Sequence, residues 1–433
     1  MRSKKLARTA GVMFLIGSLA ACSGGSGSAG SQEGPVTLSF WSWVPNIDKV
    51  VATWNSSHPD IQVEVSKPAQ GDALTTKILA ADKAGNPPDL MQAEYQTLPT
   101  LVTNGVVADV TSHLESVRGQ FSDTVWSQVT FGDKRYGVPQ DIGPMMFFYR
   151  KDLFAKYDLL VPTTWAEYAA TAEAVHAKDP EVHLGGFSAA DPGWFTGLVS
   201  QAGGSWWSFD GTSWGVRADD AAGTKVADFW DGLVREGSID SSAWWTPEWN
   251  SKLDQGKILS WVSAVWAPGV LSGSAPKTGG KWAAAPLPQW RSGENVTGFW
   301  GGSSTAVAAR SKHVAAAAQF AQWLNTDPAG VKGLIAQGSV YPASTSGQSS
   351  PALSETPEIL SADQADFYTR AEKIAAGARA FTWGPNVNVA YSAFNDAFGK
   401  AVQNRTAFSA GLRSIQTAVV ADMKKSGFTI SER

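Results

Sequence analysis

The chain has 433 residues, of which 43% are hydrophobic and 17% are charged, with 35 basic residues against 39 acidic ones. This composition is not that of a disordered or highly charged chain. The formal charge of −4 argues against nucleic acid or an anionic surface as the main partner. The length is too great for one core and favours two lobes of ordinary domain size.

The first 21 residues have the layout of a secretory signal peptide. Four basic side chains precede an apolar run over residues 11–20, which is too short to span a bilayer. The sequence Leu-Ala-Ala-Cys that ends at Cys22 resembles the lipobox of bacterial lipoproteins, in which the cysteine sulfur is acylated. We therefore expect a signal peptide over residues 1–21, lipid attachment at Cys22, and a Gly- and Ser-rich flexible tether over residues 22–35. Removal of residues 1–21 takes away four basic residues and leaves a formal charge of −8.

Motifs for metal binding and catalysis are absent from the sequence. Cys22 is the only cysteine, so neither a disulfide nor a cysteine metal site is expected. The five histidines show no ligand spacing, and the Gly-rich stretches lack the Lys-Ser/Thr ending of a phosphate loop. The sequence predicts no metal, no cofactor and no catalytic residues.

Strand and helix patterns alternate after the tether, which predicts an open α/β sheet whose ligands bind beyond the carboxyl ends of the strands. Apolar runs and period-2 alternation predict strands over Val36–Trp41, Ile61–Val65 and Pro88–Ala93. Helical spacing predicts one helix from Ile47 with Asn46 as its N-cap, and a second over Ala73–Lys83 with Asp72 as its cap.

A second α/β segment follows Tyr136. Thr164 and Glu167 form a capping-box pattern that opens a helix to about His176. Further strands are predicted over Leu184–Ser188, Ile258–Trp266, Lys281–Leu287 and Gly301–Ala309. Further helices are predicted over Thr224–Arg235, over Val314–Leu324, and from Phe408 until just before Gly427.

Tryptophan is unusually frequent, with 20 Trp against 8 Tyr. A core rarely needs so many indoles, because Leu and Phe fill volume without a polar N–H that must be hydrogen-bonded. We expect part of this surplus to line a binding surface. Flat aromatic faces suit the apolar C–H faces of pyranose rings, and the indole N–H can donate to a hydroxyl.

Four segments together resemble the extracellular solute-binding proteins of carbohydrate ABC importers, the group that includes maltose-binding protein. Gly85–Met91 resembles the family's turn into the third strand, and Tyr136–Asp141, continuing to Tyr149–Phe154, resembles the crossing from the first lobe to the second. Val161–Tyr168 resembles the start of the second lobe's first long helix. Gly301–Ser304, with Ala315–Leu324, resembles the return strand and its helix.

The resemblance implies an α/β, two-lobed fold with three interlobe crossings, which we place near residues 140–143, 298–301 and 340–343. Lobe 1 is expected to comprise residues 36–140 plus 300–341, and lobe 2 residues 141–299 plus 342–433. The expected ligand is a sugar or oligosaccharide, and the expected partner is the membrane permease of the importer. The chain would act as a lipid-anchored monomer on the extracytoplasmic face of the bacterial cell membrane.

Candidate ligand contacts in the first lobe and the first crossing are Trp43, Asn46, Glu94, Tyr95 and Asp141. Trp43 and Asn46 come just past the first strand, and Glu94 and Tyr95 follow the third, where the family places ligand contacts. A carboxylate at Asp141 can accept hydrogen bonds from two adjacent sugar hydroxyls. The alternatives are a core position for Trp43, a solvated loop for Glu94, and a hinge-stabilising bond for Asp141.

Candidate contacts in the rest of the chain are Trp206, Trp266, Trp300, Gly301 and Trp383. Trp266 is expected to end a strand of the second lobe, where the family often stacks a sugar. Gly301 would let a ligand approach the backbone closely, and Trp383 is expected in a loop. For the adjacent pairs Trp206–Trp207 and Trp244–Trp245, we expect at most one member of each pair to face the cleft.

Two other functions remain open on the sequence alone. A secreted glycoside hydrolase is also rich in Trp and would need two carboxylates on either side of the bond that it cleaves, with Asp141 and Glu94 as the available pair. The same fold could instead bind a peptide, a polyamine or another polar solute. Several carboxylates and few stacked indoles in the cleft would favour that second alternative.

Overall fold

The computed structural model describes residues 35–431. The predicted signal peptide, the lipid attachment site at Cys22 and tether residues 22–34 lie outside the described residues. None of the helices within residues 35–431 combines the length and the apolar character needed to cross a bilayer.

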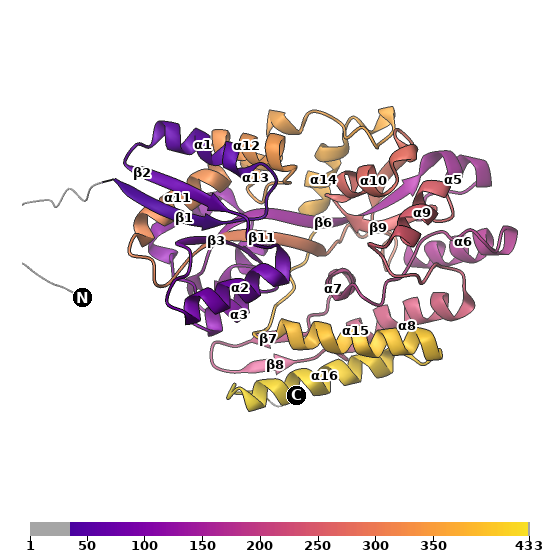
Figure 1. Ribbon diagram of the computed structural model, residues 1–433. Helices are drawn as coiled ribbons and strands as arrows, with labels where there is room; N and C mark the ends of the chain where they lie inside the picture. Colours follow the sequence, from indigo (N-terminus) through magenta and orange to yellow (C-terminus); the bar gives the residue numbers. More distant parts are fainter. Residues whose placement is uncertain (1–34, 432–433) are drawn as a thin grey trace, which may run out of the picture. The chain divides into compact units, whose positions relative to one another are not determined.

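The strands form one large mixed sheet and two small hairpins (Figure 1). Their bounds are β1 Val36–Trp41, β2 Ile61–Ser66, β3 Leu90–Glu94, β4 Thr130–Phe131, β5 Lys134–Arg135, β6 Val138–Arg150, β7 Trp207–Phe209, β8 Trp214–Val216, β9 Ser260–Ala264, β10 Trp282–Pro286 and β11 Phe299–Val307. The strand order in the large sheet is β10-β6-β11-β3-β1-β2, and β9 pairs with β6 beside β11. The pair β4–β5 and the pair β7–β8 make the hairpins.

Strand β6 connects two halves of the large sheet. Its first half, up to Pro144, pairs antiparallel with β11, and its second half, from Met145, pairs antiparallel with β9 on one side and β10 on the other. With 13 residues at about 3.3 Å each, β6 spans roughly 43 Å. In Figure 1 it runs from the region of β1, β2 and β3 to the region of β9 and α5.

The helices cover both halves of the sheet. Their bounds are α1 Ile47–Ser57, α2 Gly71–Lys83, α3 Leu98–Thr103, α4 Asp123–Ser127, α5 Lys151–Tyr157, α6 Trp165–Lys178, α7 Pro192–Gln201, α8 Ala221–Glu236, α9 Pro247–Gln255, α10 Ala267–Ser274, α11 Val314–Thr326, α12 Pro328–Gly338, α13 Thr345–Gln348, α14 Phe367–Ala375, α15 Val387–Asn404 and α16 Phe408–Lys425. The last two lie side by side and contact each other along their length (Figure 1).

The α/β class predicted from the sequence is confirmed, and most element predictions agree with the structure to within a few residues. The capping box is present: the Thr164 hydroxyl accepts from the Glu167 N–H, and the Glu167 carboxylate accepts from the Thr164 N–H. Asn46 is the N-cap of α1, but its side chain makes no capping hydrogen bond. Helix α2 begins at Gly71, so the prediction that Asp72 caps it is wrong.

The predicted strand Leu184–Ser188 does not form a regular ladder. The segment pairs with its neighbours through single bridges only, His183 with Ile258 and Gly186 with Asp240. Two backbone hydrogen bonds join it to Asp240: the Asp240 N–H donates to the Gly185 carbonyl, and the Phe187 N–H donates to the Asp240 carbonyl. The apolar run therefore correctly predicted a buried segment, but isolated bridges take the place of a strand ladder.

Most of the tryptophans belong to the core. The fully buried ones are Trp54, Trp165, Trp194, Trp206, Trp207, Trp230, Trp249, Trp261 and Trp282. Three large hydrophobic residues in the described part of the chain are exposed, namely Leu160, Phe209 and Trp245. The indole surplus is thus mainly a feature of packing, and only the rings that retain accessible surface are available for a ligand.

Candidate functional site

A pocket of about 310 Å³ lies where the carboxyl ends of β1 and β3 meet the beginning of β11. We call it the central pocket. It is lined by Trp43, Glu94, Gln96, Asp141, Asp191, Gly193, Trp245, Trp266, Trp300, Gly301, Gly302 and Ser303. Its volume is at the lower end of the range that small-molecule sites occupy.

The sheet topology places the first group of these residues. Trp43 follows the end of β1, and Glu94 is the last residue of β3. Strand β11 runs antiparallel to β3 and β6, so its first residues lie at the same edge, and Ser303 is opposite both Glu94 and Asp141. Residues that are far apart in the sequence therefore meet at one end of the sheet.

A buried hydrogen-bond chain fixes Trp43 and Asp141. The Gln92 side chain, 3% exposed, accepts from the Trp43 N–H at 3.1 Å and donates to the Ser303 hydroxyl at 3.0 Å. The Ser303 hydroxyl in turn donates to the Asp141 carboxylate. Because each group in the chain has a partner, the pocket edge is held in one arrangement before any ligand arrives.

Burial raises the pKa of the Asp141 carboxyl from its ordinary 3.8 to about 6, against the opposing effect of the hydrogen bonds from Ser303. The Asp141 carboxylate is therefore mostly ionised at neutral pH, and no Lys, Arg or His side chain within residues 35–431 forms an ion pair with it. Such a group is a strong acceptor for a ligand hydroxyl.

The second wall of the pocket consists of three indoles. The rings of Trp266 and Trp300 meet edge to face at 4.7 Å, and the Trp245 ring lies 6.4 Å from Trp266 and 6.0 Å from Trp300. The Trp266 N–H donates to the Trp300 carbonyl at 2.9 Å, which fixes the orientation of Trp266. Trp266 lies two residues past β9, at the N-cap of α10, and not within the strand as the sequence suggested.

Trp245 is the most accessible of these indoles, with 49% of its surface exposed. Its backbone has φ of 65°, a left-handed conformation that is uncommon for a bulky residue. Its indole N–H donates to both carboxylate oxygens of Asp191, at 3.2 and 3.1 Å. Burial raises the pKa of Asp191 to about 6, and the hydrogen bonds from Trp245 and Ser188 oppose that rise. Trp245 and Asp191 thus form one unit that presents an aromatic face and a carboxylate together.

Gly302 is required by the close packing at the crossing of β11 and β6. Its φ is +112°, and a Cβ there would lie 2.7 Å from the Tyr95 ring. At Gly143, a Cβ would lie 2.0 Å from the Trp300 carbonyl oxygen. These two glycines let the strands approach each other closely and bring Trp300 to the pocket wall.

Six of the ten predicted ligand contacts line the central pocket: Trp43, Glu94, Asp141, Trp266, Trp300 and Gly301. Asn46 does not, because its side-chain amide donates to the Gln337 carbonyl at 3.1 Å. Tyr95 is 2% exposed and packs against Gly302 beneath the pocket.

The structure corrects the prediction for Trp206. This residue is 1% exposed and packs against Phe195, Phe381 and Phe394. A ring enclosed on all sides by apolar side chains has no free face for a ligand, so Trp206 is a core residue.

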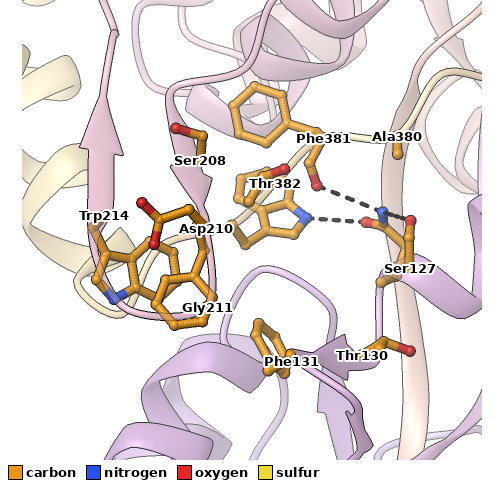
Figure 2. A pocket seen from close by; sticks show the side chains of 14 residues that line it. Ser127, Thr130, Phe131, Ser208, Asp210, Gly211, Trp214, Ala380, Phe381 and Thr382 are labelled. Atoms are coloured by element: carbon orange, nitrogen blue, oxygen red, sulfur yellow. Dashed lines mark hydrogen bonds between the residues drawn. The ribbon is translucent and has the colours of Figure 1, made fainter. Parts of the chain in front are cut away.

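Trp383, the remaining prediction, lines a different pocket of about 570 Å³ between α4, the β7–β8 hairpin and residues 380–383. Figure 2 shows this pocket, with dashed lines for the hydrogen bonds between the residues that line it. The Trp383 N–H donates to Gln128 at 3.3 Å, and the Gln128 amide donates to the Phe381 carbonyl at 3.5 Å. The Asp210 carboxylate accepts from its own loop. The polar groups of this pocket are engaged with one another, which makes it the weaker candidate.

Sequence reasoning missed six residues of the central pocket: Gln96, Asp191, Gly193, Trp245, Gly302 and Ser303. For Trp245 a signal existed, since the pair Trp244–Trp245 was expected to place at most one ring in the cleft, and Trp244 is 3% exposed. Asp191 precedes Pro192 at the start of α7, which reads as an ordinary helix start and carries no sign of a ligand. Within residues 35–431, no three His, Cys, Asp or Glu side chains are grouped so that they could hold a metal ion.

Comparisons with known proteins point to one group. Residues 49–361 match a protein family described as bacterial extracellular solute-binding protein. The arabinooligosaccharide-binding protein of Bacillus subtilis (strain 168) is 22% identical over 71% of this chain and 73% of its own length.

Solved structures give the same result. The galacto-N-biose-/lacto-N-biose I-binding protein of an ABC transporter from Bifidobacterium longum, in complex with lacto-N-biose, is 28% identical, covers 93% of this chain and 100% of its own, and superposes with a TM-score of 0.81. An ABC transporter associated binding protein from B. animalis subsp. lactis Bl-04, in complex with beta-1,6-galactobiose, is 26% identical, covers 92% of this chain and 99% of its own, and has a TM-score of 0.76. The two-lobed α/β fold predicted from the sequence is thereby confirmed.

Proposed function

Because the chain belongs to the bacterial extracellular solute-binding proteins, we propose that it captures a neutral oligosaccharide in the central pocket and delivers it to the membrane permease of an ABC importer. The observation that carries this proposal is the meeting of Trp43, Trp245, Trp266 and Trp300 with the Asp141 carboxylate in one pocket. Indole faces pack on the apolar faces of sugar rings, and carboxylate oxygens accept from sugar hydroxyls. Relatives with this fold include binding proteins in complex with disaccharides.

The charge of the pocket restricts the kind of sugar. Among the described residues, its lining includes the acidic residues Glu94, Asp141 and Asp191 and contains neither Lys nor Arg. An anionic ligand such as a uronic acid or a sugar phosphate would be repelled, because like charges in a partly buried site raise the free energy of binding. A neutral sugar pays no such penalty, which favours it as the ligand.

The relatives are binding proteins rather than enzymes, and capture without chemical change is the proposed activity here as well. The alternative of a non-sugar polar solute was expected to show several carboxylates and few stacked indoles. The pocket has three carboxylates but also four tryptophans. The carboxylates fit that alternative, and the number of indoles does not.

Capture proceeds by closure of two lobes around the sugar. Lobe 1 comprises residues 36–140 and 300–341, and lobe 2 comprises residues 141–299 and 342–433. This division is supported by β6, whose pairing changes from β11 to β9 and β10 between Pro144 and Met145. Trp43 and Glu94 belong to one lobe and Trp245 and Trp266 to the other, so closure grips the ligand from both sides.

The mature chain is held at the extracytoplasmic face of the cell membrane by lipid on Cys22, and it acts there as a monomer. The lipobox and the tether that follows it support this arrangement. Replacing Cys22 with Ser should move the protein from the membrane fraction to the medium while sugar binding is retained. A Cys22→Ser variant that stays with the membrane would contradict lipid anchoring.

Isothermal titration calorimetry with a panel of neutral oligosaccharides tests the function. The panel should include gluco-, xylo-, arabino- and galacto-oligosaccharides, a uronic-acid oligosaccharide, and spermidine as a polycation. We expect a Kd of the order of 1 μM, about −8 kcal/mol, for at least one neutral sugar. If spermidine binds and none of the sugars does, the ligand is a cationic solute and not a sugar. Release of reducing sugar during incubation with an oligosaccharide would show that the protein is a hydrolase.

A further inference from the structure

Asp191 is the residue before α7, but its side chain does not cap that helix. An Asp at this position usually accepts a hydrogen bond from a backbone N–H two or three residues later. The Asp191 side chain makes no such bond, and both of its oxygens accept from the Trp245 indole N–H, at 3.2 and 3.1 Å. The carboxylate therefore holds a ring that lies 54 residues further along the chain, in place of its own helix.

Helix α7 keeps this carboxylate in a fixed position. All residues of α7 except Gly193 are buried, and the helix packs against β11, α8 and α15 (Figure 1). Gly193 lines the central pocket beside Trp300, because a Cβ on it would lie 3.4 Å from the Trp300 ring. The Asp191 carboxylate is thus a rigid attachment point at the edge of the central pocket.

The backbone around Trp245 directs its ring away from the core. Trp244 is 3% exposed, and the Thr246 hydroxyl caps α9 by accepting from the Trp249 N–H. Between these two anchored residues, Trp245 has φ of 65°, which is unfavourable for a bulky side chain. The left-handed residue separates the two indoles, so that Trp244 packs in the core and Trp245 lines the central pocket.

Two features of the Asp191–Trp245 pair are unfavourable for the fold. One is the left-handed backbone of Trp245. The other is the carboxylate: burial raises the pKa of Asp191 to about 6, and in the part of the chain that the structure describes no cationic side chain pairs with it. A ring that stays 49% exposed offsets little of this by packing. Backbone strain and a buried charge that occur together in a pocket indicate a role in binding.

We propose that Asp191 is a positioning residue, which holds the Trp245 ring in the orientation that packs on the sugar before the sugar arrives. This inference rests on the proposed sugar-binding function, and it gives Asp191 an effect through Trp245 and not through a sugar contact of its own. Without the carboxylate, the exposed ring would sample several rotamers. The apparent Kd would then rise in inverse proportion to the fraction of molecules with the ring in the binding orientation.

Three variants and a control test this role. Asp191→Ala removes the acceptor, whereas Asp191→Asn keeps one oxygen that can accept from the indole N–H. Trp245→Phe keeps an aromatic ring but has no N–H to donate. Asp220→Ala is the matched control, because the Asp220 side chain caps α8 by accepting from the Gly223 N–H and does not line the central pocket.

Calorimetry measures the Kd for the disaccharide of the gluco-, xylo-, arabino- or galacto-series that binds the wild type most tightly. Asp191→Ala should raise this Kd about tenfold, which corresponds to a free ring in the binding orientation about a tenth of the time. Trp245→Phe should raise it at least as much, and Asp191→Asn should stay within about threefold of the wild type because its hydrogen bond remains. Asp220→Ala should keep the wild-type Kd.

Thermal melts at pH 7.5 separate positioning from a role in the fold. Asp191→Ala removes a buried charge and no helix cap, so it should melt at or above the wild-type temperature. Asp220→Ala removes a cap and should melt at a lower temperature. If Asp191→Ala melts well below the wild type and keeps the wild-type Kd, Asp191 serves the fold and the inference is wrong.

A double-mutant cycle separates positioning from direct contact with the sugar. Because Asp191 acts through Trp245, Asp191→Ala should not raise the Kd further in the Trp245→Ala background. If the two effects multiply instead, the carboxylate contacts the sugar itself and the positioning role is wrong. A wild-type Kd for Trp245→Phe would also overturn the inference, since the hydrogen bond would then not matter, while sugar binding itself would stand. If the wild type binds no sugar at all, the proposed function fails and this inference fails with it.

Discussion

Replacement of Trp245 by Ala is the sharpest test of the central pocket. Trp245 is 49% exposed, contacts Trp266 and Trp300, and donates to Asp191. A Trp side chain offers up to about 250 Å² of surface, so roughly 120 Å² remains for a ligand to cover. At about 25 cal/mol per Å², complete coverage would be worth about 3 kcal/mol.

That free energy sets the upper limit of the effect. A loss of about 3 kcal/mol corresponds to roughly a 150-fold increase in Kd, and ordering costs on binding reduce it, so we expect a 10- to 150-fold increase. The buried half of the ring also contributes to the fold. Its removal should lower the free energy of unfolding by about 2 kcal/mol, less than for a fully buried Trp.

Phe209→Ala is the matched control. Phe209 is 37% exposed and lines the pocket of Figure 2 instead of the central one. The Phe209→Ala variant should lose about as much free energy of unfolding as Trp245→Ala does, and it should bind sugar with the wild-type Kd. Calorimetry gives the affinities and urea denaturation gives the stabilities. If Trp245→Ala binds sugar as the wild type does, and Phe209→Ala does not, the site has been assigned to the wrong pocket.

Three further predictions concern the fold and the pH dependence. Because the folded-state pKa of Asp141 is raised to about 6, the native state holds a proton between pH 4 and 6 that the unfolded state releases, and this contribution to stability is lost as pH rises through 6. Asp141→Asn should therefore be more stable than the wild type at pH 7.5, by up to about 3 kcal/mol, and should have no such advantage at pH 4; urea denaturation at each pH measures both differences. The variant should also bind sugar more weakly than the wild type at pH 7.5. If the variant and the wild type are equally stable at both pH values, Asp141 does not carry a buried charge. Trp206→Ala should lower the free energy of unfolding by about 3–5 kcal/mol and leave the Kd for sugar unchanged in calorimetry. If the variant instead keeps the wild-type stability and its Kd rises, Trp206 contacts the ligand. Gly302→Ala should cost more than Gly211→Ala in thermal melts, since both have positive φ but only at Gly302 does a new Cβ meet the Tyr95 ring; equal costs would show that backbone strain alone matters.

Local patterns in the sequence were reliable wherever neighbouring residues decide the structure. The capping box at Thr164 was predicted because its two hydrogen bonds involve residues only three positions apart. Helix α1 and strand β2 were predicted because a single face of each is apolar. The predicted strand over Leu184–Ser188 shows the limit, since a strand also needs a pairing partner from elsewhere in the chain, and this segment has only isolated bridges.

The sequence by itself determined the α/β class, the family resemblance, the absence of disulfides, and that residues after strand ends, such as Trp43 and Glu94, could line a site. It could not decide which of 20 tryptophans are accessible, because Trp206 and Trp245 differ only in what the rest of the chain packs against them. Only the tertiary structure placed Trp245 beside Asp191 and Tyr341 beside the crossing of β6. The physical reason is that the accessibility and the hydrogen bonds of a side chain depend on contacts between segments more than 50 residues apart in the chain. A local sequence pattern does not predict which distant segments make those contacts.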